Sequence, residues 1–404
     1  MKKKLLIAGG GYADIPLIKA GQQLGYYIIT SGNRPDDMGH RYSDAHYLAD
    51  FSDKEAIYQL AQKLKVDAIC PCCNDFSAIS CAYTAQKMGL PGHDPYDVSL
   101  IIHHKDRYRQ FAQENEVSSP NAKGFSNVDD AMQAIENWNF PLIVKPVDLS
   151  GGKGMKILTE LDQAKPALEM ALYRSKIKRV VVEEFIEGTR HGFSAFLHKG
   201  KIVFYFSDNE HYFTNPFLVS AASTPSIVPN MVVKKLCLQS EKISKRLNLT
   251  EGLFHVQYIL KQDEPFIIEI TRRAPGDLYI QFVKHATGVD YPSYIVKAAA
   301  GLDISDISQV EPQGFFTRHC IMAAQAGVVK NLRFDKKVEQ KIIDKMIWGK
   351  IGDRIEDAMT SKLGIVFIKF DTMDEMLDQT ERMQELIHVM TEGQEVNEND
   401  IGSA

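Results

Sequence analysis

The sequence lacks the features that mark membrane-spanning and secreted proteins. No apolar run approaches the ~18 residues that a membrane-spanning helix requires. Three lysines and the apolar stretch Leu5–Ala8 resemble the start of a signal peptide, but Gly9–Gly11 end that stretch early, so a first β-strand is expected instead. The 6 cysteines are scattered without the even spacing of a disulfide framework, which favours a reducing cytoplasm.

A dominant charge of one sign is also missing. With 47 basic and 52 acidic residues, the formal net charge is −5. That balance gives no electrostatic attraction to nucleic acid or to an anionic membrane, and neither partner is expected. Cys70 and Cys73 have Cys-x-x-Cys spacing, yet no second pair follows to complete a zinc site. A buried strand end is the preferred interpretation of this segment.

What the sequence does contain is alternation of strand and helix patterns near the N-terminus. Short apolar runs at Leu5–Ala8, Tyr26–Thr30 and Val66–Cys70 predict strands, with amphipathic segments between them. Ser52-Asp53-Lys54-Glu55 reads as a capping box that opens a helix ending near Lys65. The pattern predicts an open parallel α/β sheet.

The remaining patterns predict a mixed α/β and α+β fold, with a two-part middle region and a small C-terminal α+β domain. Ser126, Thr159 and Thr372 are expected to cap helices. The expected segments are an N-terminal α/β domain (1–95), linker helices (96–121), a first middle part (122–188), a second middle part (189–310) and the C-terminal domain (311–404).

The stretch Phe266–Arg273 places one carboxylate in an otherwise apolar strand. It is expected to be buried on both faces, where Glu269 would need a cation nearby. If Leu260 pairs with Phe266 across the preceding turn, Gln257 lies opposite Glu269, and Thr271 shares the same face. Two interpretations follow: a divalent metal bound at this face, or an internal salt bridge from Glu269 to Arg272 or Arg273.

Two glycine-rich loops follow predicted strands. Gly9–Gly11 invites a dinucleotide-binding interpretation, but the position of the third glycine is Asp14, which makes a tight turn the preferred one. The second loop, Ser150–Met155, follows a strand that ends in Lys145 and holds three glycines, a serine and a lysine. It suits either a mobile phosphate-binding loop or an ordinary hairpin turn.

Four motifs occur in the order typical of the ATP-grasp ligases. They are Lys145-Pro146, the Ser150–Met155 loop, Val182–Gly188 and Ile268–Arg273. Residues 1–310 resemble these enzymes, including relatives of carbamoyl-phosphate synthase and of purine biosynthesis. The C-terminal segment resembles the extra domain of ATP-grasp L-amino-acid ligases. The resemblance implies that the two middle parts form an ATP-grasp clamp.

The resemblance also implies residue roles. For ATP it implies phosphate contacts from Lys105, Lys145, Ser150, Gly151, Gly152 and Gly154, adenine contacts from Glu183, Glu184, Phe185 and Ile186, and a ribose contact from Glu187 or His191. For Mg²⁺, or Mn²⁺ in its place, it implies Glu269, Gln257 and Thr271 as ligands, although the family usually has two glutamates and an asparagine. For catalysis it implies Arg273, Lys153 and Arg272.

The function implied is an ATP-dependent ligase that joins a carboxylate to an amine through an acyl phosphate, with an amino acid as one substrate. A purine-biosynthesis-like carboxylase or ligase is one alternative, and an ATP-binding protein with weakened catalysis is another. The partners are small-molecule carboxylates and amines, and the family allows a homodimer. His103 and His104 are expected at a solvated helix start, whereas Ser207–Phe213 suits either an acceptor pocket or a surface loop.

Overall fold

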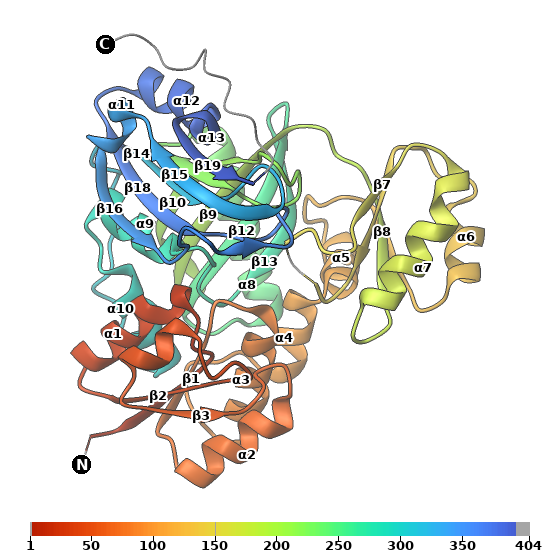
Figure 1. The fold of residues 1–404 in the computed structure, drawn as a ribbon. Helices are drawn as coiled ribbons and strands as arrows, with labels where there is room; N and C mark the ends of the chain where they lie inside the picture. The colour runs from red at the N-terminus through yellow and green to blue at the C-terminus, as the bar shows by residue number, and fades with distance from the viewer. Residues whose placement is uncertain (1, 150, 393–404) are drawn as a thin grey trace. The chain divides into compact units, whose positions relative to one another are not determined.

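The computed structural model describes residues 2–149 and 151–392, and the chain divides into two compact units (Figure 1). The first unit comprises Met1–Asn209 and Ser226–Gln313, and the second comprises Glu210–Pro225 and Gly314–Ala404. Among the helices of the described ranges, none is long and apolar enough to cross a membrane.

A four-stranded parallel sheet opens the first unit, as predicted. Its order is β3-β2-β1-β4, with bounds Ala45–Leu48, Tyr27–Gly32, Lys4–Ala8 and Ala68–Pro71. The helical segments around it are η1 (Tyr12–Asp14), α1 (Ile15–Gln23), η2 (Met38–Tyr42), α2 (Lys54–Leu64) and α3 (Asp75–Met88). Leu5, Leu6 and Ile7 of the inner strand β1 are fully buried, as expected of a parallel strand between two neighbours.

The N-cap of α2 differs from the predicted capping box. The Asp53 carboxylate accepts hydrogen bonds from the main-chain N–H groups of Glu55 and Ala56, so Asp53 rather than Ser52 is the cap. Aspartate caps a helix as well as serine does, and its charge also favours the helix N-terminus.

A second, antiparallel sheet follows the helices α4 (Tyr96–His103) and α5 (Lys105–Glu114). Its order is β5-β8-β6-β7, with bounds Ala122–Phe125, Val180–Glu184, Leu142–Pro146 and Lys156–Leu158. The helices α6 (Val128–Ile135) and α7 (Ala164–Arg174) lie beside it (Figure 1). The predicted caps Ser126 and Thr159 are wrong: Asn127 caps α6, and Glu160 is the N-cap of a 3-10 helix, η3 (Leu161–Gln163), which precedes α7.

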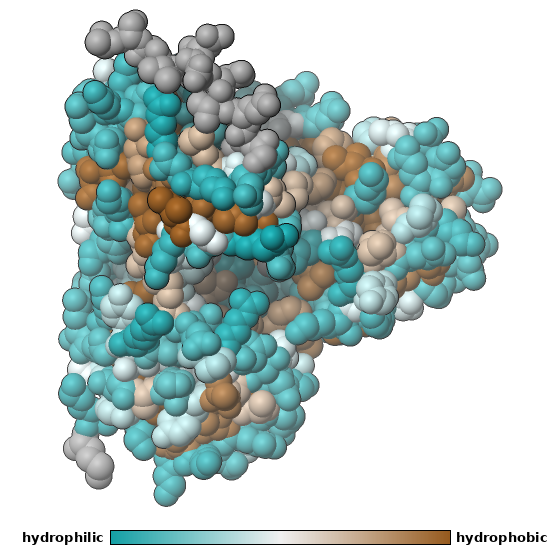
Figure 2. All heavy atoms as spheres, viewed as in Figure 1, coloured by the Kyte–Doolittle hydropathy of each residue, from teal (hydrophilic) through white to brown (hydrophobic). Residues whose placement is uncertain are grey.

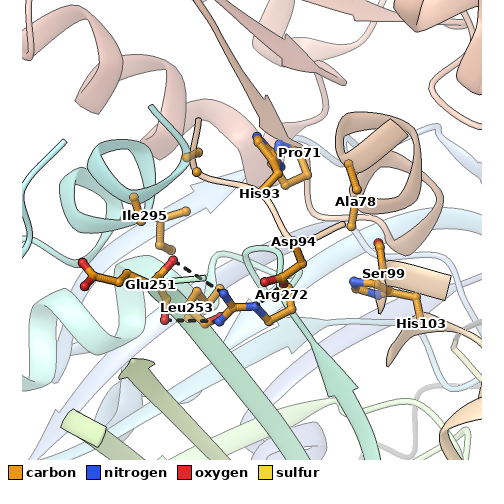
Figure 3. Close-up of a pocket in the computed structure, with 15 residues that line it drawn as sticks. Pro71, Ala78, His93, Asp94, Ser99, His103, Glu251, Leu253, Arg272 and Ile295 are labelled. Atoms are coloured by element: carbon orange, nitrogen blue, oxygen red, sulfur yellow. Dashed lines mark hydrogen bonds and ion pairs between the residues drawn. The ribbon is translucent and has the colours of Figure 1, made fainter. Parts of the chain in front are cut away.

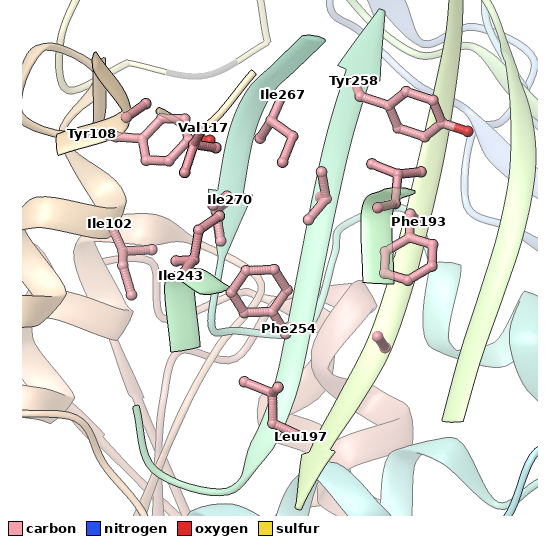
Figure 4. Close-up of a cluster of buried hydrophobic side chains, with 14 of the residues drawn as sticks. Ile102, Tyr108, Val117, Phe193, Leu197, Ile243, Phe254, Tyr258, Ile267 and Ile270 are labelled. Carbon is pink, nitrogen blue, oxygen red and sulfur yellow. The ribbon is translucent and has the colours of Figure 1, made fainter. Parts of the chain in front are cut away.

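A buried core of the first unit lies on four strands of an antiparallel sheet, in the order β13-β12-β9-β10. The strand bounds are Glu264–Thr271, Gly252–Lys261, Thr189–His198 and Lys201–His211, and the helices are α8 (Asn230–Leu247), α9 (Tyr279–Thr287) and α10 (Tyr291–Ala299). Figure 4 shows the buried cluster on this sheet, which includes Phe193, Phe254, Tyr258, Ile267 and Ile270.

A β-bulge interrupts the pairing of β12 with β13. Leu260 pairs with Pro265 rather than with the predicted Phe266, but the register shifts beyond Ile267 and brings Gln257 opposite Glu269, as predicted. Ile268 is the extra residue of the bulge. Because of this shift, Ile267 and Ile270 both belong to the core, and Glu269 lies on the opposite face with Gln257.

The second unit is a small α+β domain, the fold class that the sequence predicts for the C-terminal segment, and it also contains residues 210–225, which the sequence assigns to the second middle part. Its strands follow the order β11-β14-β18-β16, with bounds Ala221–Thr224, Phe315–Ile321, Gly364–Phe370 and Ile342–Ile347. Its smaller sheet has the order β17-β15-β19, with bounds Arg354–Ile355, Gly327–Phe334 and Ile387–Thr391, and its helices are α11 (Lys336–Glu339), α12 (Met373–Glu381) and α13 (Met383–Leu386). Thr372 caps α12, as predicted. In Figure 2, apolar side chains gather on the face of this unit.

Candidate functional site

A buried glutamate binds two of the cations near the predicted nucleotide site. Lys145, at the end of β6, places its Nζ 2.7 Å from Glu183 Oε2 on the neighbouring strand β8. Arg109 of α5 places its Nη2 3.0 Å from Glu183 Oε1. Burial alone would raise the pKa of Glu183, but Arg109 and Lys145 more than offset this and lower it. The cluster therefore carries a net positive charge near Lys145.

Arg109 also supports the bulge in β13. Its Nη2 donates to the main-chain oxygen of Ile268 at 2.8 Å, and Ile268 is the residue that has no partner in the register with β12. A bulged residue leaves its main-chain groups without ladder bonds, and a buried group of this kind needs another partner. The Glu183 cluster thereby fixes the strand segment that presents Glu269.

Lys105 connects this region to Glu269. It is the first residue of α5, and its Nζ donates to the main-chain oxygen of Leu149 at 2.9 Å and lies 3.8 Å from Glu269 Oε1. The preceding His103 and His104 are both buried, so the predicted solvated helix start is wrong. The helix begins against the loop after β6, where burial, together with nearby Arg107, lowers the pKa of His104 to about 4.

Glu269 itself is less buried than the sequence suggested. β13 lies at the edge of its sheet rather than between two strands, and the Glu269 side chain is 25% exposed. In the described part of the chain, the internal salt bridge predicted from Glu269 to Arg272 or Arg273 is not formed. Arg272 pairs with Asp94, and Arg273 pairs with Asp75. Among the residues that the structure describes, Lys105 is a cation within 4 Å of Glu269.

Arg273 is held by Asp75, a residue that the sequence analysis missed. The Arg273 Nε and Nη2 atoms each lie 3.1 Å from one carboxylate oxygen of Asp75, a bidentate pair. Thr271 Oγ1 donates to Asp75 Oδ1 at 3.2 Å, and His103 Nδ1 lies 3.0 Å from the same oxygen. Burial alone would raise the pKa of Asp75, but Arg273 and His103 hold it well below its usual range.

Arg272 binds a different carboxylate, that of Asp94, in a separate network (Figure 3). Its Nε lies 2.8 Å from Asp94 Oδ2, and its guanidinium also donates to the main-chain oxygens of Thr250 and Leu253. Arg272, Asp94 and Leu253 border a small cavity of about 40 Å³ together with His103. The contacts anchor the start of β12, and the catalytic assistance predicted for Arg272 stays a prediction.

The second glycine-rich loop joins β6 to β7 in a hairpin. Gly151, Gly152 and Gly154 have φ values of 67°, 75° and 73°, in the left-handed region that favours glycine. A Cβ at Gly154 would lie 2.9 Å from the Pro146 ring. Lys153 is exposed in this loop. Ser150 lies outside the described residues.

The predicted adenine and ribose residues occupy different environments. The Glu183 side chain belongs to the buried ion cluster, while Glu184 accepts hydrogen bonds from Asn121. Phe185 is half-buried, Ile186 is buried and Glu187 is exposed. His191 is buried against the Tyr258 ring, with centroids 5.5 Å apart, and burial lowers its pKa to about 4. Of the two ribose candidates, Glu187 is the more accessible.

These residues fit nucleotide phosphates well and a magnesium ion less fully. Lys105 and Lys145 supply cations beside a loop whose backbone requires glycine. For the metal, Glu269 supplies one carboxylate, and Gln257 supplies a neutral oxygen opposite it. The Thr271 hydroxyl donates to Asp75 but retains oxygen lone pairs. Magnesium keeps waters and takes phosphate oxygens, so such a donor set suffices for weak binding.

The dinucleotide and zinc interpretations are not supported. The Asp14 carboxylate accepts the main-chain N–H groups of Gly11 and Cys73, which occupies the turn after β1. Burial raises the pKa of Cys70 to about 12 and raises those of Cys72, Cys73 and Cys81 well above the usual value. Over residues 2–149 and 151–392, no group of three or more His, Cys, Asp or Glu side chains is placed to hold a metal.

Comparison with known proteins relates the chain to one family. The family model described as carbamoyl-phosphate synthase L chain, ATP binding domain, matches residues 105–307. A curated relative, the C-terminal section of the carbamoyl phosphate synthase large chain of Aquifex aeolicus, is 22% identical over 325 residues. The match covers 76% of this chain and 60% of that relative, so this chain spans less than two thirds of its length.

Two solved structures share the fold over almost the whole chain. The L-amino acid ligase of Bacillus licheniformis has a TM-score of 0.81 at 17% identity, covering 97% of this chain and 99% of that one. The phosphoribosylglycinamide synthetase of Anaerococcus prevotii has a TM-score of 0.75 at 23% identity, covering 97% and 100%.

Replacing Asp75 should destabilise the protein strongly. Asp75→Asn leaves the mostly buried Arg273 guanidinium without its carboxylate, and breaking such a pair costs about 3–5 kcal/mol. The expected result is a lower thermal midpoint than for the exposed control Asp97→Asn. Adding Arg273→Leu to Asp75→Asn should recover part of the loss, because no unpaired charge remains. Equal midpoints for Asp75→Asn and the control would contradict this role.

The Asp75–Arg273 pair should also make the free energy of unfolding depend on pH in the acid range. The pKa of Asp75 is lower in the folded state than in the unfolded chain, so its contribution is fully present above the unfolded pKa of about 4. It is lost progressively as pH falls below that value toward the folded pKa. Urea unfolding at a series of pH values between neutrality and about pH 3 should give a shallower acid limb for Asp75→Asn than for the wild type. An equal decrease of the free energy of unfolding with falling pH in Asp75→Asn and the wild type would contradict the lowered pKa of Asp75.

Proposed function

Because the chain belongs to the family of the carbamoyl-phosphate synthase L chain ATP-binding domain, the ATP-grasp ligases, we propose that it is an ATP-dependent carboxylate–amine ligase. In the proposed reaction a carboxylate oxygen attacks the terminal phosphorus of ATP and ADP leaves. The amine then attacks the acyl phosphate and displaces phosphate. The observation that carries the proposal is the approach of Lys105 to both Glu269 and the loop carbonyl of Leu149.

The side chains would act mainly by charge and position. Lys105 and Lys145 would offset charge on the phosphates, because lysine presents a compact cation at the end of a flexible stem. Arg273, oriented by Asp75, would steady the transferring phosphoryl group and the acyl phosphate. Lys153 and the glycines beside it would close over the site and exclude water from the acyl phosphate.

The nucleotide and the metal would be held by the neighbouring strands. The adenine would lie beside residues 184–186, with Glu187 favoured over the buried His191 for the ribose. Glu269, Gln257 and Thr271 would hold the metal. A bound magnesium ion would supply charge neutralisation on the phosphate oxygens.

An amino acid is the proposed substrate class for one of the two partners. The fold shared with an L-amino acid ligase over 97% of this chain supports it. The fold shared with a phosphoribosylglycinamide synthetase keeps a purine-type ligase as an alternative. A nucleotide-binding protein with weak catalysis is the other alternative, and it is favoured by the neutral side chains of Gln257 and Thr271 at the metal strand.

The decisive experiment measures ADP release by the full chain. ATP would be supplied with Mg²⁺ or Mn²⁺ against a panel of L-amino acids, singly and in pairs. Release that depends on an added amine supports the ligase. Nucleotide binding without amine-dependent release under either metal would instead favour the binding-protein alternative.

Glu269→Ala should remove turnover. The loss of the Glu269 carboxylate should lower kcat by at least about 100-fold, the size of a lost electrostatic contact in a transition state. The control is Glu264→Ala on the same strand, where the side chain pairs with Lys235 at the surface. Thermal midpoints would establish that both variants are folded. An unchanged kcat for Glu269→Ala would exclude the metal role.

Gln257→Glu should strengthen metal binding. A second carboxylate directly opposite Glu269 adds an anionic ligand, so the Mg²⁺ concentration for half-maximal rate should fall several-fold. The matched control is Gln262→Glu, the same change at the exposed turn of the same hairpin. A metal requirement that is unchanged or raised in Gln257→Glu would count against this geometry.

A further inference from the structure

A cavity of about 790 Å³ lies at the carboxyl ends of the N-terminal parallel strands. The loops that follow β1, β2, β3 and β4 all contribute to its wall. The sheet order β3-β2-β1-β4 means that the chain leaves β1 toward one side and later returns to the other. In open α/β sheets, ligands bind outside the carboxyl ends of the strands at such a reversal point.

The same cavity reaches residues tied to the proposed transfer site. Leu149, whose carbonyl accepts from Lys105, and Lys153 of the glycine-rich loop both line it. On another side it is lined by Asp277, which follows Arg273 in the chain and accepts a hydrogen bond from Tyr12 at 2.8 Å. A molecule in this cavity would therefore lie next to Lys153, one of the residues proposed to close over the acyl phosphate.

In the turn after β1, a carboxylate accepts a main-chain N–H group that could otherwise bind an anion. In phosphate-binding loops, main-chain N–H groups at this position bind the ligand. Here the N–H of Gly11 donates to Asp14 Oδ2 at 2.8 Å, and the N–H of Cys73 donates to Asp14 Oδ1 at 2.9 Å. The carboxylate of Asp14, only 3% exposed, thus already accepts the Gly11 N–H, one of the donors that a phosphate at this turn would use.

The charged side chains that line the cavity also disfavour an anionic ligand. Carboxylates outnumber cations among the lining residues. The carboxylates are Asp14, Asp36, Asp37, Asp50 and Asp277, and the cations are Arg34, Lys153 and Lys176.

One of those cations is engaged in the wall itself. Lys176 Nζ donates to Ser52 Oγ at 3.0 Å and lies 4.8 Å from the centroid of the Phe76 ring. It also stabilises the Asp50 carboxylate, whose pKa is lowered despite partial burial, chiefly by hydrogen bonds from Ser52. With Lys176 engaged in this way, the other charged side chains that line the cavity are mainly carboxylates. The cavity therefore favours a positively charged ligand over a phosphorylated one.

We propose that this cavity takes the amine substrate, and that the amine is a small, positively charged molecule without a phosphate group. The inference rests on the proposed ligase function and narrows its substrate class. It separates this chain from ligases that take a phosphorylated amine, because Asp14 occupies the anion-binding turn. Asp37 and Asp277 are the carboxylates that would face the ammonium group.

The test measures binding without ATP, using the full chain and ligand-observed NMR titration. The probes are 1,4-diaminobutane and the matched pair ethanolamine and O-phosphoethanolamine. Ethanolamine should bind more tightly than its phosphate ester. Asp37→Asn and, separately, Asp277→Asn should weaken diaminobutane binding by about two- to fivefold, the effect expected of one partly exposed charge pair. Asp378→Asn, at an exposed position on α12, is the matched control.

The outcomes separate this inference from the ligase proposal. Tighter binding of O-phosphoethanolamine, no diaminobutane binding, or affinities unchanged by both Asn variants would overturn the amine site and leave the ligase proposal standing. Failure of every amine to stimulate ADP release, with the binding pattern as expected, would overturn the ligase and leave the charge preference of the cavity intact. Two Asn variants at separate loops guard against a folding defect in either one.

Discussion

The buried carboxylate of Glu183 is the interaction on which the geometry of this site depends. A carboxylate without solvent is strongly unfavourable unless cations meet it, and here Lys145 and Arg109 do so from two other elements. Arg109 also donates a hydrogen bond to the main-chain carbonyl of Ile268, the bulged residue of β13. One ion cluster thus joins α5, β6 and β8 to the strand segment that presents Glu269.

Local patterns in the sequence predict most of the elements, but not the register of the strand that matters most. The predicted pair Leu260–Phe266 is wrong by one residue, and the bulge at Ile268 compensates, so that Gln257 still faces Glu269. The bulge was not predictable, because the bond that stabilises it comes from Arg109, 159 residues earlier in the chain. The sequence of β13 itself predicts a strand, whereas the bulge depends on a contact with a distant part of the chain.

The same limit explains the residues that were missed. Asp75 is the first residue of the capped helix α3, and its bond to Arg273 spans 198 residues. His103 appears polar and solvated from its neighbours, but it is buried against Asp75. The family motifs point to Arg273 and Glu269 directly, while the side chains that orient them carry no motif. Their roles in catalysis remain predictions.

The bulge at Ile268 has a consequence for how this strand tolerates changes in length. Side chains alternate faces along a strand, and Ile268 is the extra residue that breaks this alternation in β13. A deletion of Ile268 would restore the regular ladder, with Ile267 opposite Tyr258 and Glu269 still opposite Gln257, so both faces of the strand would be kept. A single codon lost here would instead remove the carbonyl that accepts from Arg109, and with it the bond that joins α5 to this strand.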